Sequence, residues 1–336
     1  MLVDRYNRPI KDLRISVTDR CNFRCTYCMP MDHYVWIERR EILTFEEIER
    51  LARLLVGLGV EEIRLTGGEP LLRHDVETLV AKLSAIAGLR DISLTTNGAL
   101  LAEKAAALKS AGLHRINISI DTLNPEKFER MTKRGDLKRV LEGVFAAKES
   151  GLLPIKINTV VERGVNDDDI LELVDFARIN GFAIRFIEYM DVGNANSWKS
   201  ERMVSKREIL DRISKTYRLV EKGREGSAPS VDYEFADGKG DLGVIASVTE
   251  PFCATCTRAR LTADGKLVTC LFSETGHDLK SLLRSGATDE QMVDVIKSVW
   301  SGRADRYSYE RLRAMESEQG YDPEKHKKIE MIVLGG

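Results

Sequence analysis

The chain lacks the features that mark secreted and membrane-spanning proteins. Its 336 residues include only 6 cysteines, which fall into two distant groups of three and make a poor disulfide framework. No apolar run reaches the ~18 residues that a transmembrane helix needs. The N-terminal residues carry charges in place of the apolar core of a signal peptide. We therefore expect a cytoplasmic protein with no membrane partner.

An excess of positive charge is also missing. The 51 Lys and Arg residues are balanced by 53 Asp and Glu residues, which gives a net charge of −2, and aromatic residues make up only 7% of the chain. A surface that binds RNA is usually basic and rich in aromatic side chains. We therefore expect no nucleic-acid partner, and a zinc-stabilised RNA-binding module explains this composition poorly. The sequence leaves open whether the chain forms a homodimer.

Six segments with the alternating pattern of β-strands are separated by segments with the spacing of amphipathic helices. The predicted strands span residues 13–17, 63–66, 92–95, 115–120, 155–161 and 183–188. The intervals are long enough for crossover connections between parallel strands, and six units are too few for a closed eight-stranded barrel. The pattern predicts an α/β fold in which an incomplete parallel (βα)6 barrel spans residues 1–190.

The alternation along these strands predicts what faces the interior of the barrel. In the first strand Leu13, Ile15 and Val17 share one face, which should pack against the helices. The cations on the opposite, inward faces of the strands are Arg14, Arg64, Lys156 and Arg185. Burying cations without partners is costly. Unless nearby carboxylates pair with them, we expect a multiply negative ligand, such as a nucleoside triphosphate, among these side chains.

The first group of cysteines directly follows the first predicted strand. Cys21, Cys25 and Cys28 form a Cys-x3-Cys-x2-Cys pattern. Three thiolates at this spacing can each bind a different iron of a four-iron cluster, which leaves the fourth iron open for a small molecule. A closed zinc site needs four ligands, and the nearest histidine is His33. A zinc knuckle and structural thiols are the alternatives.

The second group of cysteines lies in residues 191–336, where we expect a C-terminal α+β extension. This group consists of Cys253, Cys256 and Cys270. Asp264 and Gly265 predict a hairpin turn that folds Cys270 back toward the other two cysteines. Zinc and a second iron–sulfur cluster both take thiolate ligands, so both remain open for this group. The Gly-, Ser- and Pro-rich residues 223–230 predict an exposed connection.

The first cysteine pattern, with Tyr27 before its last cysteine, resembles the signature of the radical S-adenosylmethionine (SAM) superfamily. Further segments resemble one family within it, the GTP 3′,8-cyclases. They are residues 67–70, 95–98, 119–121, 186–194 and 253–260, Cys270 and the terminal Gly335 and Gly336. The resemblance implies a radical SAM lyase that converts GTP to (8S)-3′,8-cyclo-7,8-dihydroguanosine 5′-triphosphate, the first step of molybdenum cofactor biosynthesis. The tail departs slightly, because Leu334 stands where an isoleucine is common.

The resemblance also implies roles for individual residues. Two 4Fe–4S clusters would be bound, the first by Cys21, Cys25 and Cys28 and the second by Cys253, Cys256 and Cys270. The SAM site would be lined by Tyr27, Gly68, Ser119 and Met190. GTP would be held by Arg14, Arg64, Thr95, Lys156, Arg258, Ala259 and Arg260. Gly335 and Gly336 would take part in catalysis, whereas the site role of Arg185 rests on the strand pattern alone.

The implied partners are the substrate GTP, a reductant protein and the downstream cyclic pyranopterin monophosphate synthase. The alternative enzyme is a radical SAM peptide-modifying maturase with an auxiliary cluster. Such maturases usually have more cysteines in their C-terminal part, and they have no need of four inward cations. The strand pattern therefore favours the cyclase.

Overall fold

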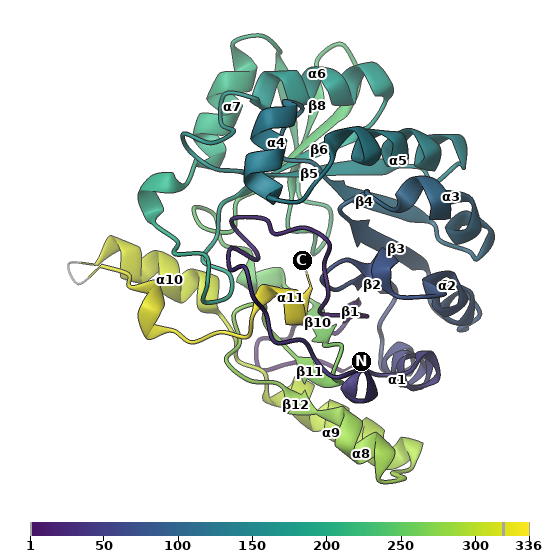
Figure 1. The fold of residues 1–336 in the computed structure, drawn as a ribbon. Coiled ribbons are helices and arrows are strands. Elements are labelled where there is room, and N and C mark those ends of the chain that lie inside the picture. The colour runs from purple at the N-terminus through teal and green to yellow at the C-terminus, as the bar shows by residue number, and fades with distance from the viewer. Residues whose placement is uncertain (1, 318–319, 336) are drawn as a thin grey trace.

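The computed structural model describes residues 2–317 and 320–335, and a single curved sheet of 12 strands runs through this part of the chain (Figure 1). The strand order is β12-β11-β10-β1-β2-β3-β4-β5-β6-β9-β8-β7. From β10 through β1 and β6 to β9, every neighbouring pair is parallel, and the pairs at both edges are antiparallel. The sheet is therefore an open parallel array with an antiparallel ribbon at each edge.

The six predicted strands are confirmed and are adjacent in sequence order. Their bounds are β1 Asp12–Ser16, β2 Glu62–Thr66, β3 Asp91–Thr96, β4 Arg115–Ser119, β5 Ile155–Val161 and β6 Ala183–Glu188. The apolar face is also as predicted, because Leu13 and Ile15 are fully buried in the main core. The incomplete (βα)6 barrel thus follows from the sequence pattern.

Helices cover the outer face of this array (Figure 1). They are α1 Phe45–Gly57, α2 Val76–Ser84, α3 Leu101–Ser110, α4 Pro125–Thr132, α5 Leu137–Glu149 and α6 Ile170–Asn180. Helix α1 begins at a capping box, in which the Thr44 hydroxyl accepts from the Glu47 amide and the Glu47 carboxylate accepts from the Thr44 amide. Its apolar stripe buries Ile48, Leu51 and Leu55 in the main core.

The C-terminal part continues the same sheet at both of its ends. Its elements are α7 Lys206–Ser214, β7 Leu219–Gly223, β8 Val231–Phe235, β9 Asp241–Ile245, β10 Arg258–Leu261, β11 Lys266–Val268, β12 His277–Asp278, α8 Leu279–Arg284, α9 Asp289–Gly302, α10 Tyr307–Glu316 and α11 Met331–Leu334. Strand β9 pairs with β6, and β10 pairs with β1. The predicted turn at Asp264 and Gly265 is confirmed, since β10 and β11 pair as an antiparallel hairpin.

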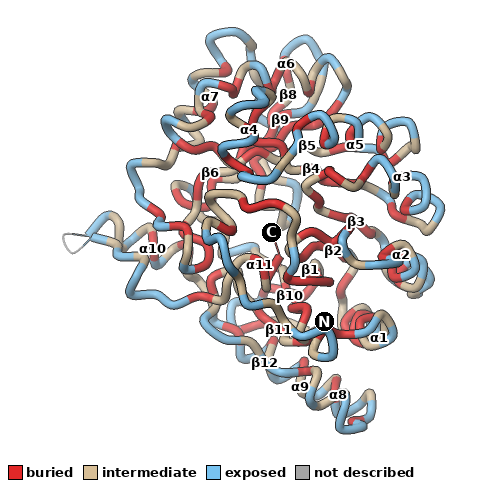
Figure 2. Tube along the Cα trace, in the orientation of Figure 1, coloured by how far each residue is buried: buried red, intermediate tan, exposed pale blue. Residues whose placement is uncertain are grey.

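The interior of the curved sheet holds helix α11. This helix lies at the centre of the fold, beside β1 and β10 (Figure 1). Buried residues follow the strands, whereas exposed residues gather on the outer turns of the helices (Figure 2). Among the residues that the structure describes, no helix is both long and apolar enough to cross a bilayer.

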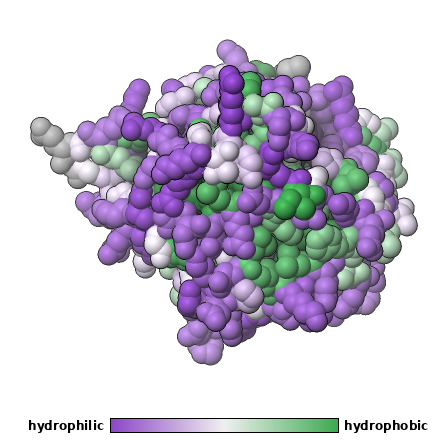
Figure 3. Space-filling view, turned by 90° about the horizontal axis from the view of Figure 1, so that it is seen from above, coloured by the Kyte–Doolittle hydropathy of each residue, from purple (hydrophilic) through white to green (hydrophobic). Residues whose placement is uncertain are grey.

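An apolar groove lies on the outer surface, over helices α4 and α5. Seen from above, the molecule is largely hydrophilic, with apolar residues gathered in limited areas (Figure 3). A groove of about 710 Å³ is lined by residues of α4 and α5 and their flanks, including Leu137, Leu141 and Phe145. No cysteine lines it. The chemistry that the sequence predicts must therefore reside in the interior.

Candidate active site

A cavity of about 1010 Å³ fills the interior of the curved sheet, and both groups of cysteines open into it. Cys21, Cys25 and Cys28 lie beyond the carboxyl end of β1, while Cys253 and Cys256 lie just before the amino end of β10. Because β1 and β10 are parallel, the two groups lie at opposite ends of the strands. The 4 residues of β10 alone span roughly 13 Å between these two ends, at about 3.3 Å per residue.

The first group of thiols is free and half-buried. Burial, followed by the charge of Glu69, raises the pKa of the Cys21 thiol to about 11. Burial also raises the pKa of Cys28 to about 12. A thiolate in such surroundings needs a nearby positive charge, which a bound metal cluster provides.

The donor set fits a cluster better than a single ion. Among the described residues no three His, Cys, Asp or Glu side chains form a group that could hold one metal ion. In a 4Fe–4S cluster the thiolates bind separate irons and need not converge on one point. Three free thiols on one loop at a cavity wall therefore suit a cluster.

Gly67 and Gly68 have a steric reason to be glycines. A Cβ on Gly68 would lie 2.3 Å from the Arg20 carbonyl oxygen, and a Cβ on Gly67 would lie 2.5 Å from that of Thr18. The Gly68 amide donates to the Thr18 carbonyl at 2.7 Å. The turn after β2 is thus packed directly against the chain that enters the first cysteine loop.

Two buried carboxylates join the loops around the first cysteine group. Glu69 accepts from the Thr96 hydroxyl and the Asn97 amide, both at 2.7 Å, and burial raises its pKa to about 7. Asp121 accepts from the Tyr27 hydroxyl at 2.8 Å, and burial raises its pKa to about 6. The four residues predicted for SAM all line this cavity; they are Tyr27, Gly68, Ser119 and Met190.

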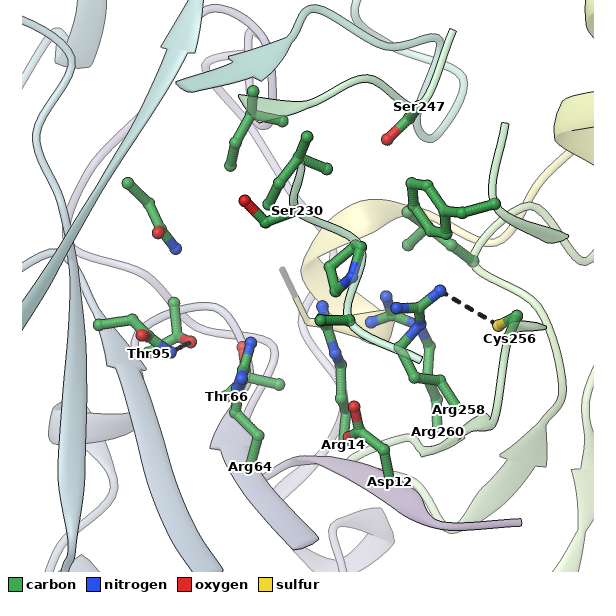
Figure 4. A pocket seen from close by; sticks show the side chains of 18 of the residues that line it. Asp12, Arg14, Arg64, Thr66, Thr95, Ser230, Ser247, Cys256, Arg258 and Arg260 are labelled. Carbon is green, nitrogen blue, oxygen red and sulfur yellow. Dashed lines mark hydrogen bonds between the residues drawn. The ribbon is translucent and has the colours of Figure 1, made fainter. Parts of the chain in front are cut away.

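Arginines from three adjacent strands point into the cavity side by side (Figure 4). The registers place Arg14 of β1 opposite Arg64 of β2 and opposite Arg260 of β10. Burial lowers the pKa of Arg14, and the charges of Arg260 and Arg64 lower it further. The Arg14 Nε is buried without a hydrogen-bond partner among the described residues. Asp12, on the same strand face, partly offsets these charges.

The remaining predicted GTP residues are mostly brought to the same cavity. Thr95, Lys156 and Arg258 line it, and burial, followed by the charge of Arg185, lowers the pKa of Lys156. Arg185 itself forms an ion pair with Asp232 at 3.1 Å, so a carboxylate of the protein balances the charge of this cation. Ala259 is an exception. Its side chain is fully buried in the core, on the face of β10 opposite to Arg258 and Arg260.

Charged donors surround the second cysteine group. Arg258 Nη2 donates to Cys256 Sγ at 3.2 Å (Figure 4), and Arg303 Nη2 donates to the same sulfur at 3.3 Å. Burial alone would raise the pKa of Cys256, but the charges of these two guanidinium groups lower this pKa to about 6. Burial, followed by the charge of Asp305, raises the pKa of Cys270 to about 12. Sequence reasoning missed Arg303, which lies on no recognisable motif.

The prediction that residues 223–230 form an exposed connection is wrong for the second half of this stretch. Ser230 is buried, and Ser227, Ala228 and Pro229 line the cavity. Ser227 is fixed by a hydrogen bond from the Thr257 hydroxyl at 2.9 Å. Composition indicated a loop correctly, but the curvature of the sheet folds that loop over the arginines (Figure 4).

The C-terminal tail enters the cavity region. Arg260 Nη1 donates to the carbonyls of Leu334 and Gly335. Gly335 has a φ of +72°, and a Cβ there would lie 2.3 Å from Thr66 Cγ2. The predicted catalytic residue Gly336 lies outside the described residues. Gly335 therefore lies where β2 meets the arginines of β1 and β10.

A buried ionic hub holds the segment that leads to the tail. Asp191, three residues beyond the end of β6, pairs with Arg311 of α10 and with Lys328 Nζ at 3.1 Å. It also accepts from the hydroxyls of Tyr307 and Tyr321. No local pattern indicates this hub, because Asp191 lies more than a hundred residues from each of its partners.

Two family models together match most of the chain. Residues 15–177 match the family described as "Radical SAM superfamily", and residues 182–309 match the family described as "Molybdenum Cofactor Synthesis C". A protein of Acidothermus cellulolyticus named "GTP 3′,8-cyclase" is 47% identical over 358 residues, covering 99% of this chain and 98% of its own. A protein of the same name from Aquifex aeolicus is 46% identical over 338 residues, covering 100% of both chains.

Solved structures share the fold at low identity. The structure of Streptococcus suis SuiB bound to S-adenosylmethionine superposes with a TM-score of 0.61 at 16% identity, over 96% of this chain and 76% of that chain. The structure of the same protein bound to precursor peptide SuiA has a TM-score of 0.63 at 16% identity, over 96% and 75% of the two chains. At such identity the likeness bears on the fold alone.

Proposed function

Because the chain belongs to the GTP 3′,8-cyclase family of radical SAM enzymes, we propose that it converts GTP to (8S)-3′,8-cyclo-7,8-dihydroguanosine 5′-triphosphate, the first step of molybdenum cofactor biosynthesis. The observation that carries this proposal is the row of inward arginines between two cysteine groups in one cavity. A peptide substrate would not call for such a concentration of positive charge, which argues against a peptide-modifying maturase. A triphosphate does call for it.

The first cysteine group would hold a 4Fe–4S cluster, and Tyr27, Gly68, Ser119 and Met190 would line the SAM site beside it. When bound, this cluster and SAM supply the one-electron chemistry that removes a hydrogen atom from the GTP ribose. The hydrogen bond from Tyr27 to Asp121 holds the cysteine loop against β4. We propose a second 4Fe–4S cluster at Cys253, Cys256 and Cys270, which are likewise free thiols at the cavity wall.

The substrate would lie between the two cysteine groups. Arg14, Arg64 and Arg260, aligned by strand register, would hold its phosphates, with Arg258, Lys156 and Thr95 as further contacts. The side chain of Ala259 faces the core, so we assign it a spacing role between the two arginines. Fixing the nucleotide at several points restricts its rotation, which favours closure of the new ring. The walls around it also exclude water from a reactive intermediate.

Two further assignments complete the proposal. Residues 1–190 would act as the SAM-binding barrel, and residues 191–336 would act as an extension that carries the second cluster and the Gly335–Gly336 tail. The partners would be a reductant protein and a downstream cyclic pyranopterin monophosphate synthase, with a homodimer left as a hypothesis. The six free thiols are compatible with a reducing cytoplasm, where we place the activity.

Iron content and product formation test the proposed function directly. Protein reconstituted anaerobically should contain about eight irons in two 4Fe–4S clusters, the type that such thiolate groups bind. With SAM, GTP and a reductant it should form the cyclised triphosphate, detected by mass spectrometry. An active protein that contains zinc and no iron would refute the proposal.

Lys156 offers a test of the triphosphate site. Because a charge-assisted contact is worth roughly 1.5–3 kcal/mol, Lys156→Met should weaken GTP binding by about 10- to 100-fold. SAM binding should change little. Calorimetric titration of each ligand measures both effects, with the exposed Lys109→Met as the matched control. Equal losses for the two ligands would show that Lys156 does not contact the phosphates.

A further inference from the structure

Arg303 makes an unusual set of contacts beside the second cysteine group. It follows the last residue of α9 and is buried. Its Nη2 donates to Cys256 Sγ at 3.3 Å, and its Nη1 donates to the Cys256 carbonyl at 2.8 Å. One guanidinium group thus donates hydrogen bonds to both the sulfur and the backbone carbonyl of the same cysteine. The two bonds fix the position of the guanidinium group relative to the sulfur.

The sulfur of Cys256 receives a second charged donor from another direction. Arg258 Nη2 lies 3.2 Å from it, and the Arg258 guanidinium group rests 4.9 Å from the centre of the Phe252 ring. Arg258 already belongs to the proposed substrate site. Arg303 does not line the cavity, so a substrate contact does not explain its position.

The surroundings of Arg303 keep it in place and only partly neutralise it. Its Nη1 lies 3.3 Å from the Oδ2 atom of Asp4, and its Nε lies 3.3 Å from Asp305. The other carboxylate oxygen of Asp4 accepts a hydrogen bond from the Tyr6 amide in the N-terminal turn. Asp4 is shared with Arg8 at 2.6 Å. Arg8 and Arg303 are balanced by Asp4 and Asp305, of which Asp305 is partly exposed, so its charge is partly screened by solvent. The guanidinium group of Arg258 adds a further positive charge next to Cys256.

The first cysteine group has a different set of donors. Cys21 Sγ receives the Phe23 amide at 3.4 Å and the Asn97 side-chain amide at 3.8 Å, both of which are neutral. Its surroundings include the carboxylate of Glu69. Hydrogen bonds and positive charge at ligand sulfurs stabilise the reduced form of an iron–sulfur cluster, because reduction adds negative charge to the cluster and its thiolates.

We propose that Arg303 is a positioning residue that raises the reduction potential of the second cluster through its paired contacts to Cys256. The inference rests on the second cluster proposed above. One electron from an external donor reduces the cluster, no covalent bond forms or breaks, and the guanidinium charge offsets the added electron. The second cluster would accordingly accept an electron more readily than it would with neutral donors alone.

An anaerobic redox titration of the iron-loaded enzyme, followed by electron paramagnetic resonance, tests this role. Arg303→Gln should lower the midpoint potential of the second cluster by an amount equal to a roughly tenfold change in its one-electron equilibrium constant, about 59 mV. The midpoint of the first cluster should not move, which provides a control inside the same molecule. Arg306→Gln is the matched control, since Arg306 stacks on Tyr6 and Tyr309 instead.

A second variant should shift the midpoint potential of the second cluster in the opposite direction. Asp4→Asn removes the anion that Arg303 and Arg8 share, so it should raise the second midpoint, whereas loosening of the fold would move both variants the same way. Shifts of opposite sign support the proposal. Unchanged midpoints, shifts of the same sign, or loss of the second cluster's iron from Arg303→Gln overturn it. A wild-type enzyme with only one cluster refutes instead the second cluster of the proposed function.

Discussion

A Gly335→Val enzyme is expected to cleave SAM at the normal rate and yet lose formation of the cyclised product by roughly a hundredfold, the scale of effect that a misplacement of about 1 Å produces. The new side chain would begin 2.3 Å from Thr66 Cγ2 and 3.0 Å from the Gly67 amide nitrogen. The backbone φ of +72° also disfavours a β-branched residue there. The tail must therefore leave its place against β2.

SAM cleavage and cyclisation should be affected differently because the tail contacts the arginines that we place at the substrate. Arg260 donates to the carbonyls of both Leu334 and Gly335, so the tail fixes a side chain that we place on the triphosphate. The first cysteine loop makes its own contacts and should retain its cluster. The two reactions then separate, with SAM cleavage kept and cyclisation lost.

The assay compares 5′-deoxyadenosine with cyclised product in single reactions by mass spectrometry. Gly57→Val is the matched control, because a Cβ at Gly57 on α1 meets no atom within 4 Å. Deletion of Gly335 and Gly336 should reproduce the Gly335→Val result. If Gly335→Val forms product at the wild-type rate, the tail has no part in positioning the substrate.

Local patterns explain why much of this fold and half of the site could be predicted from the sequence. Strand alternation is a property of consecutive residues, so it placed Arg14, Arg64 and Lys156 on the inward face without knowledge of strand pairing. The cysteine spacing is equally local. The inward placement of these three cations is confirmed by the cavity lining, whereas cluster binding by the two groups of cysteines stays a prediction.

Contacts over long sequence distances explain what could not be predicted. The row of arginines depends on β10 pairing with β1, and nothing in either strand specifies that partner. The position of Arg303 beside Cys256 depends on how α9 ends, 47 residues further along the chain. A charged residue in a helix is usually solvated, so Arg311 in α10 resembles a surface residue although it is fully buried.

The last large effect is expected at the ionic hub. Asp191→Asn keeps the size of the side chain but leaves Arg311 and Lys328 buried without their anion, and both cations are at most 1% exposed. Breaking a buried ion pair in this way costs about 3–5 kcal/mol. The loss should be local to α10 and residues 320–335, because the hub joins this segment to the end of β6.

Hydrogen exchange of the iron-loaded enzyme measures the effect segment by segment. A loss of about 3 kcal/mol corresponds to exchange roughly 100-fold faster in α10 and the tail, with the (βα)6 strands unchanged. Glu316→Gln, an exposed change on the same helix, is the control. Uniformly faster exchange, or none, would contradict a local role for Asp191.

Acid provides an independent check of the same hub. Burial alone would raise the pKa of Asp191, but the charges of Arg311 and Lys328 lower this pKa below its usual 3.8. The carboxylate therefore stabilises the fold at any pH above 3.8, and this contribution is lost only as the pH falls from there through the lowered folded pKa. In the wild type, protection of residues 320–335 from hydrogen exchange should survive to about pH 4, whereas Asp191→Asn should lack this protection at every pH.

Because residues 320–335 lead directly to Gly335, Asp191→Asn should also keep SAM cleavage and lose cyclisation, as expected of Gly335→Val.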